Sequence, residues 1–430
     1  MRRKRFWALL AAAALVVALL PLVLAPAATA KSAEAEDVRF ATFNASLNRN
    51  FDGQLMVDLS APGNPQADAV AEIIQRVNPD VLLINEFDFD SGGVALAGFI
   101  TNYLEVPHGD AAAITDYDFT FIAPSNTGIH PGADPGIDFD NNGVVDPVPA
   151  PFNFTYANDA YGFGWFPGQF GMAVLSRYPI DGDNIRTFQN FLWEDMPGAL
   201  LPDNPGTPAP ADWYSQDELD IFRLSSKSHW DVPILIDGRT VHFLVSHPTP
   251  PVFDDPAPFP PGSVDYNGRR NFDEIRFWAD YIHPGRSGYI YDDNGVYGGL
   301  AGDDRFVIAG DQNSDPLDGD SIPGSIQQLL DHPKVNTKMT PTSPGGPEQA
   351  VLQGGANDTH LSGPAFDTAD FSDSAPGNLR ADYVLPRKNM KIMGSGVFWP
   401  LSSDPLFPLV GTFPFPSSDH RLVWIDVRVG

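Results

Sequence analysis

Three short motifs in the last third of the chain contain residue types that suit metal-assisted hydrolysis. They are Gly-Asp-Gln-Asn at 310–313, Arg-Ala-Asp-Tyr-Val-Leu at 380–385 and Ser-Asp-His at 418–420. Each follows or opens an apolar run typical of a strand, so we expect their polar side chains at strand ends: Asp311, Asn313, Asp382, Asp419 and His420. Oxygen ligands suit a hard divalent cation such as Mg²⁺ or Ca²⁺, and a histidine beside an aspartate is a common general base. The motifs therefore predict a metal-assisted hydrolytic site.

The elements that must position these side chains can be predicted from apolar patterning. Runs rich in β-branched or aromatic residues predict strands at Val38–Ala45, Val81–Asn85, Met172–Ser176, Val232–Ile236, Val241–Ser246, Arg305–Ala309, Tyr383–Pro386 and Leu422–Val429. Apolar positions on one face predict helices at Ala67–Val77 and Phe272–Ile282. A mixed, largely antiparallel set of strands with few helices favours sheets covered by helices, with the site in loops at one strand end.

Residues 1–30 have the pattern of an export signal. Basic residues at 2–5 precede an apolar run over 6–24, and Ala28-Thr29-Ala30 is typical of a cleavage site. The alternative is an uncleaved membrane anchor, because the apolar run approaches spanning length, but Pro21 and Pro26 favour cleavage. We therefore expect a secreted, extracellular protein that starts near Lys31 and keeps no stable membrane span.

The composition is strongly acidic and lacks cysteine. Loss of the basic residues at 2–5 changes the formal net charge from −29 to −33, and the chain has 0 Cys, which excludes disulfides. Such a surface disfavours nucleic-acid binding through a basic face, although local metal ions can override the global field.

We find no internal repeat and no composition break that would split the mature chain. The sequence therefore predicts a single domain over 31–430, a monomer with no implied protein partner. Pro- and Gly-rich segments predict surface insertions around 124–168, 197–211, 248–268 and 341–378.

Further motifs earlier in the chain carry a family resemblance. Phe-Asn-Ala-Ser at 43–46, Ile-Asn-Glu-Phe at 84–87, Gly-Met-Ala-Val-Leu-Ser-Arg-Tyr-Pro-Ile at 171–180 and Val-Ser-His-Pro at 245–248 precede the three acidic motifs. In this order they resemble the endonuclease/exonuclease/phosphatase superfamily, the deoxyribonuclease-I-like group, over 38–429. The resemblance implies an α/β fold: a four-layer α/β sandwich, two packed mixed β-sheets flanked by helices, with long loop insertions.

The resemblance also implies a set of metal ligands. Glu86 matches the main ligand, and Asn44 and Asp419 match residues that help to hold the ion or its waters, so we expect Mg²⁺, or Mn²⁺ or Ca²⁺, in the site. Asn85 stands where the family often has glutamine.

Catalytic roles follow from the same resemblance. Asp311 and Asn313 match the pair that orients the attacking water and the phosphoryl oxygens. His420 matches the catalytic base, oriented by Asp382, and His247 matches the second histidine, which binds the phosphate or assists the leaving group. Whether His420 or Asp311 takes the proton stays open, and the proline after His247 is expected to reshape its loop.

Two further groups of residues are candidates for binding. A loop with oxygen ligands at EF-hand-like spacing predicts a structural Ca²⁺, with an acidic solvated turn as the alternative: Asp138, Asp140, Asn142 and Asp146. Substrate-facing groups, with ordinary loop or helix surface as the alternative, are predicted at Lys227, His229, Arg270 and Asn271.

The sequence thus predicts a secreted divalent-metal-dependent phosphoesterase that hydrolyses a phosphate ester by in-line attack of an activated water. Its substrate is expected to be a small molecule, a lipid or a nucleic acid. An alternative is an extracellular endonuclease or exonuclease on DNA or RNA, and a remote alternative is a non-catalytic, calcium-stabilised binding module.

Overall fold

Two mixed β-sheets contain most of the strands in the computed structural model, which describes residues 36–132, 136–254, 260 and 262–430. The six-stranded sheet has the order β12 (Lys391–Val397), β13 (Val423–Val429), β1 (Glu36–Leu47), β2 (Val81–Phe87), β4 (Met172–Ser176) and β3 (Phe119–Phe121). The five-stranded sheet has the order β11 (Asp382–Pro386), β8 (Arg305–Asp311), β7 (Arg239–Ser246), β6 (His229–Ile236) and β5 (Arg186–Thr187). The predicted export signal lies outside the described residues.

The two sheets pack face to face through a shared apolar core. Phe40 of β1 and Phe243 of β7 have ring centroids 5.6 Å apart, and Phe121 of β3 lies edge-on to Trp230 of β6 at 5.0 Å. These contacts join residues from both sheets within one buried cluster. Burial of alternate apolar residues along paired strands is the main source of stability in such a sandwich.

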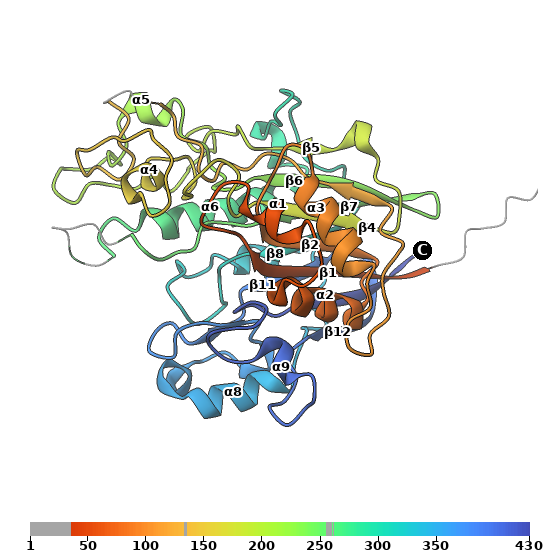
Figure 1. Cartoon of the computed structure of the whole chain (residues 1–430). Helices are drawn as coiled ribbons and strands as arrows, with labels where there is room; N and C mark the ends of the chain where they lie inside the picture. The colour runs from red at the N-terminus through yellow and green to blue at the C-terminus, as the bar shows by residue number, and fades with distance from the viewer. Residues whose placement is uncertain (1–35, 133–135, 255–259, 261) are drawn as a thin grey trace, which may run out of the picture. The chain divides into compact units, whose positions relative to one another are not determined.

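Helices cover the outer faces of both sheets (Figure 1). The ends of α2 (Pro65–Val77) are fixed to β1, since Gln66 donates to the Ser46 carbonyl at 2.9 Å and Arg39 donates to the Val77 carbonyl at 2.5 Å. On the other side, α6 (Tyr266–Tyr281) contacts the five-stranded sheet through Trp278, whose indole donates to Ser246 Oγ at 3.0 Å. The layers are therefore helix, sheet, sheet and helix, which confirms the predicted four-layer α/β sandwich.

The remaining described elements are short. The helices are α1 (Gln54–Leu59), α3 (Val94–Phe99), α4 (Phe154–Asn158), α5 (Gln216–Leu219), α7 (Gln327–Leu330), α8 (Gly345–Gln353) and α9 (Phe407–Val410). Single turns occur at Ile100–Leu104, Gly182–Asn184, Ser287–Tyr289, Gly355–Thr359 and Pro364–Phe366, and β9 (Ala369–Asp370) pairs with β10 (Asn378–Leu379). No helix among these residues is both long and apolar enough to cross a membrane.

Most predicted strands are present within two or three residues of their expected ends, and Met172–Ser176 has the predicted bounds. β12 was not among the predicted strands, because Gly394 and Gly396 interrupt its apolar pattern and its first residues are largely exposed. The segment 341–378 is more than a surface loop, since it contains α8 and the β9–β10 pair.

Strand direction brings distant motifs to one edge of the sandwich. β1 and β2 are parallel, as are β7 and β8, so the carboxyl ends of each pair lie together. β13 runs antiparallel to β1 and β11 runs antiparallel to β8, so their first residues lie at those same ends. Asp382 is the direct register partner of Asp311. The topology thus places six strand ends around one site, as expected for ligand sites at carboxyl ends of parallel strands.

Candidate active site

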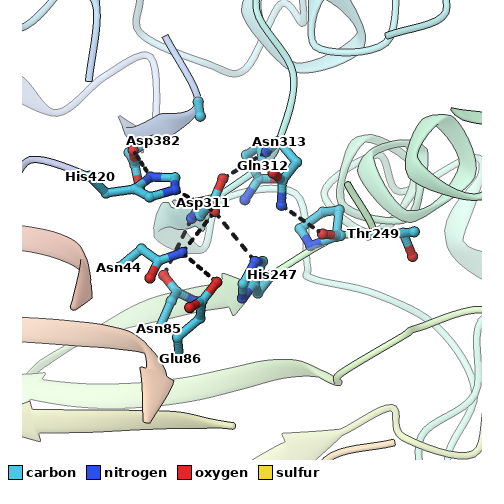
Figure 2. Close-up of polar contacts among 12 residues, drawn as sticks. Asn44, Asn85, Glu86, His247, Thr249, Asp311, Gln312, Asn313, Asp382 and His420 are labelled. Atoms are coloured by element: carbon cyan, nitrogen blue, oxygen red, sulfur yellow. Dashed lines mark hydrogen bonds and ion pairs between the residues drawn. The ribbon is translucent and has the colours of Figure 1, made fainter. Parts of the chain in front are cut away.

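Asp311, the last residue of β8, lies at the centre of a buried polar cluster (Figure 2). Its side chain is 1% exposed, and its Oδ2 lies 3.1 Å from Asn44 Nδ2, 3.3 Å from His247 Nε2 and 3.6 Å from His420 Nε2. Its Oδ1 accepts from the backbone amide of Asn313 at 2.9 Å. Burial alone would raise the pKa of Asp311, but His420, His247 and Asn44 together hold that pKa below its ordinary value.

His420 is fixed by a buried aspartate on the opposite side of its ring. Its Nδ1 donates to Asp382 Oδ2 at 2.8 Å, and the same oxygen accepts from the Thr368 hydroxyl at 2.8 Å. Burial raises the pKa of Asp382 to about 6. Burial would lower the pKa of His420, yet the charges of Asp382 and Asp311 raise it well above its ordinary value. The Nε2 atom therefore faces Asp311 in a fixed orientation, which is the arrangement of an oriented general base.

Glu86, the penultimate residue of β2, presents a carboxylate beside this cluster. Its φ is 57°, a left-handed conformation that is unusual for a residue with a side chain. Oε1 accepts from Asn44 Nδ2 at 3.0 Å and Oε2 accepts from Asn48 Nδ2 at 2.8 Å. Burial and then the charge of Asp419 raise the pKa of Glu86. A carboxylate held in such a negative environment has the donor chemistry and the electrostatic need of a divalent-cation ligand.

Asp419 reaches the same edge from the loop before β13. Its Oδ1 accepts from Ser46 Oγ at 3.3 Å and from Ser418 Oγ at 3.4 Å. Ser418 Oγ also donates to the Asn44 carbonyl at 2.7 Å, which fixes this loop to β1. The three predicted metal ligands, Asn44, Glu86 and Asp419, thus come from β1, β2 and the loop that β13 follows.

His247 directly follows β7 and is 2% exposed. Burial, with a contribution from the charge of Lys227, lowers the pKa of His247 to about 4. Its Nδ1 is buried and has no hydrogen-bond partner among the described residues. The loop after it is held by Glu274 of α6, which accepts from the Thr249 amide at 2.6 Å, and by Asn313, whose side chain donates to the Pro248 carbonyl at 3.1 Å. His247 is therefore a neutral imidazole held against Asp311.

Asn85 connects the two sheets beneath the site. Its Oδ1 accepts from the Asp311 amide at 3.3 Å and from Thr42 Oγ1 at 3.2 Å, and its Nδ2 lies 3.5 Å from the Ser246 carbonyl. The sequence analysis noted Asn85 only as a departure from the family pattern. The available signal for this role was a polar amide directly after the apolar run Val81–Ile84 of β2. Asn48 and Thr368 were missed, and nothing in their local sequence distinguishes them from ordinary loop residues.

The predicted substrate-facing residues separate into one that lies at the site and three that are structural. Lys227 is buried before β6, and its charge interacts with Glu274, Glu86 and Asp311. No hydrogen bond or ion pair to its ammonium occurs within the described part of the chain.

His229, Arg270 and Asn271, also predicted to face the substrate, make structural contacts within the described residues. His229 is buried between the Glu274 carbonyl at 2.9 Å and Ser225 Oγ at 3.0 Å. Arg270 donates to backbone carbonyls, including that of Leu224 at 2.8 Å. Asn271 donates to the carbonyls of Thr249 and Gln312. Arg270 and Asn271, near the start of α6, are buried and satisfy backbone carbonyls, and His229, the first residue of β6, is buried between a carbonyl and a hydroxyl.

The predicted calcium loop is only partly assembled. Asp138 and Asp140 lie together, with Asp159 as a third carboxylate that the sequence analysis did not include. Asp146 instead accepts from Asn153 Nδ2 at 2.9 Å, and Asn142 Oδ1 accepts from the Val144 amide at 2.7 Å. The prediction of Asn142 and Asp146 as ligands is therefore not supported by the fold of this loop.

Similarity to known proteins identifies the family to which the chain belongs. No curated protein sequence matches the chain. An endonuclease/exonuclease/phosphatase from Beutenbergia cavernae is 17% identical, with 92% of this chain and 72% of that chain covered and a TM-score of 0.45. Sphingomyelinase C from Streptomyces griseocarneus is 12% identical, with 91% and 99% covered and a TM-score of 0.42, and beta toxin from Staphylococcus aureus is 13% identical, with 90% and 99% covered and a TM-score of 0.41. Residues 41–420 match the pattern of a family of hydrolytic, metal-dependent phosphoesterases and nucleases, and the chain belongs to that family, the Endonuclease/Exonuclease/phosphatase family.

Proposed function

We propose that the chain is a secreted, divalent-metal-dependent phosphoesterase that hydrolyses a phosphate ester by in-line attack of water. The observation that carries this proposal is the contact of one carboxylate, Asp311, with Asn44, His247 and His420, beside the partly buried Glu86. Water-activating and charge-stabilising groups are thereby gathered within one site.

The oxygen donors fit a divalent cation held by Glu86, with Asn44 and Asp419 supporting the ion or its waters. When bound, it supplies Lewis-acid stabilisation of phosphoryl oxygens and a positive charge that favours the neutral form of His420. Burial, followed by the charge of Asp419, raises the pKa of Glu86, and this need for a counter-charge supports the assignment.

The remaining catalytic roles belong to side chains of the protein itself. Asp311 and the side chain of Asn313 orient the water and the phosphoryl oxygens. His420 in its neutral form is the better proton acceptor of the two candidates, because the pKa of Asp311 is held below its ordinary value and that carboxylate is therefore the weaker base. Its Nδ1 donates to Asp382, which leaves Nε2 to take the proton from water. His247 then stabilises the phosphoryl group or assists the leaving group.

Lys227 is proposed to attract the substrate phosphate. Its buried ammonium lies in the electrostatic range of Glu86 and Asp311 and makes no ion pair within the described residues. Lys227→Gln is expected to lower kcat/KM by about 10²-fold, because one charged contact to the transition state is lost. Thermal unfolding should be unchanged or shifted upward, since an unpaired buried charge is removed. Lys388→Gln, at an exposed position, is the matched control. Equal kcat/KM for the Lys227 variant and the wild type would remove Lys227 from the mechanism.

The function is tested by release of p-nitrophenol from bis- and mono-phosphate esters, and by cleavage of DNA, RNA and a phospholipid, with Mg²⁺, Mn²⁺, Ca²⁺ or EDTA. Hydrolysis that EDTA abolishes and added metal restores is expected. Bacterial cells that express the full chain should release this activity into the medium as a protein starting near Lys31. No metal-dependent product from any substrate would contradict the enzyme assignment, and cleavage of DNA or RNA alone would favour the nuclease alternative.

A further inference from the structure

A second cluster of carboxylates, outside the candidate active site, comes from residues near α4, the helix labelled in Figure 1. Asp138 and Asp140 belong to the turn before this helix, and Asp159 directly follows it. One carboxylate oxygen from each residue lies within 4.8 Å of the other two. The turn is closed by backbone amides, since Gly143 donates to Asp138 Oδ2 at 2.7 Å and Asn142 donates to Asp140 Oδ1 at 3.1 Å.

Asp159 carries an independent indication of a ligand. Its side chain is 0% exposed, and its Oδ1 accepts from the Phe139 amide at 2.9 Å. Its Oδ2 is buried and has no hydrogen-bond partner among the described residues. Burial, together with the charges of Asp140 and Asp138, raises the pKa of Asp159 to about 7. Asp159 thus adds a buried carboxylate to two further carboxylates. It has no basic partner among the described residues, so it lacks the counter-charge that buried carboxylates ordinarily have.

We propose that Asp138, Asp140 and Asp159 bind a divalent cation of the calcium class, with water completing its coordination. The donors are all hard oxygens, and no histidine or cysteine contributes to the cluster, which favours Ca²⁺ over zinc and other softer metals. The third carboxylate, Asp159, directly follows the C-terminal end of α4. Asp146, the residue at the expected loop spacing, instead accepts a hydrogen bond from Asn153.

The cation would join the loop to the wall of the active site. Phe139, held by Asp159, packs its ring against Phe222 with centroids 4.6 Å apart and against Tyr161 at 5.9 Å. Gly162, next in the chain, accepts from the Gly128 amide at 2.8 Å. The Asn126 amide nearby donates to the Lys227 carbonyl at 2.8 Å. The second site is therefore structural, and it stabilises the segment that supports Lys227.

The test separates this site from the catalytic one by using Glu86→Gln as the parent protein. Thermal unfolding of the purified parent is expected to shift upward by at least about 2 °C when Ca²⁺ reaches 100-fold over its Kd. Asp159→Asn in this parent should lose the shift, while its unfolding midpoint without Ca²⁺ stays equal or rises, because a buried charge is neutralised. Asp146→Asn is the matched control and should keep the shift.

A second measurement tests the proposal even if the Asp159 variant folds poorly. The indole of Trp213 donates to the Phe139 carbonyl at 3.3 Å, so Tb³⁺ bound in the cluster should emit after tryptophan excitation and be displaced by Ca²⁺. Asp140→Asn, at a partly buried position, should lower the Tb³⁺ affinity measured from this emission at least tenfold. Absence of any Ca²⁺ response in the parent, or an equal response in the Asp159, Asp140 and Asp146 variants, would overturn the proposal.

Discussion

Glu86→Gln is expected to reduce metal-dependent phosphoester hydrolysis on the order of 10³-fold in kcat/KM, with the fold preserved. Glutamine has the shape of glutamate and keeps an oxygen for the Asn44 amide, which donates to Glu86 Oε1 at 3.0 Å. It lacks the negative charge that a divalent cation requires. The loss should not be recovered at high Mg²⁺ or Mn²⁺ if Glu86 is the main ligand, so kcat/KM is measured across a metal titration.

The matched control for this change is Glu72→Gln on α2. Glu72 is a partly buried carboxylate that pairs with Arg76 on the same helix, so its replacement removes a charge without touching the site. Thermal unfolding in EDTA provides a second readout: Glu86→Gln should unfold at a higher temperature than wild type, because the repulsion between Glu86 and Asp419 is removed. Retention of wild-type metal-dependent turnover in Glu86→Gln would assign the metal to other residues.

His420→Asn is expected to lower kcat by about 10³-fold while leaving KM within a small factor, since the proton acceptor is lost and the substrate contacts remain. Asp382→Asn should lower kcat less, because the imidazole is still present but no longer oriented by the 2.8 Å contact to Nδ1. The double variant should be no slower than His420→Asn alone, as expected for two residues that act as one unit.

The chain contains a matched control for this pair. His242 Nδ1 contacts Asp231 Oδ1 at 2.7 Å, but this histidine lies within β7 rather than at the site. His242→Asn should leave kcat and KM unchanged while disturbing a similar His–Asp contact. Wild-type kcat in His420→Asn would instead favour Asp311 as the proton acceptor.

The positions of Asp311 and Asp382 were predictable from local patterns, whereas Asn44, Glu86 and His247 were predicted from the order of the family motifs. A polar residue at the end of an apolar run predicts a strand end, and Asp311 and Asp382 are found there, whereas Asn44 lies three residues before the end of β1. The contacts among them were not predictable in this way. Asn85 and Asp311 are 226 residues apart in the chain, and only the packing of two sheets brings them within 3.3 Å.

The errors have a related physical origin. The helical pattern of α6 was evident, but the sequence does not say which polar positions are covered, and the fold buries Arg270 and Asn271 beneath loops. Similarly, loop spacing favoured Asp146 as a calcium ligand. The third carboxylate is instead Asp159, which follows Asp146 in the chain with α4 in between. Thr368 supports Asp382 from a segment with no strand or helix signal at that position.

The distribution of the site over both sheets makes catalysis depend on the docking of the two sheets. Asn44 and Glu86 belong to the six-stranded sheet, whereas Asp311 and Asp382 belong to the other, and Asn85 joins the two. A compact intermediate with both sheets formed but not yet docked would show native secondary structure and no turnover. Recovered activity during refolding therefore reports the docking of the two sheets.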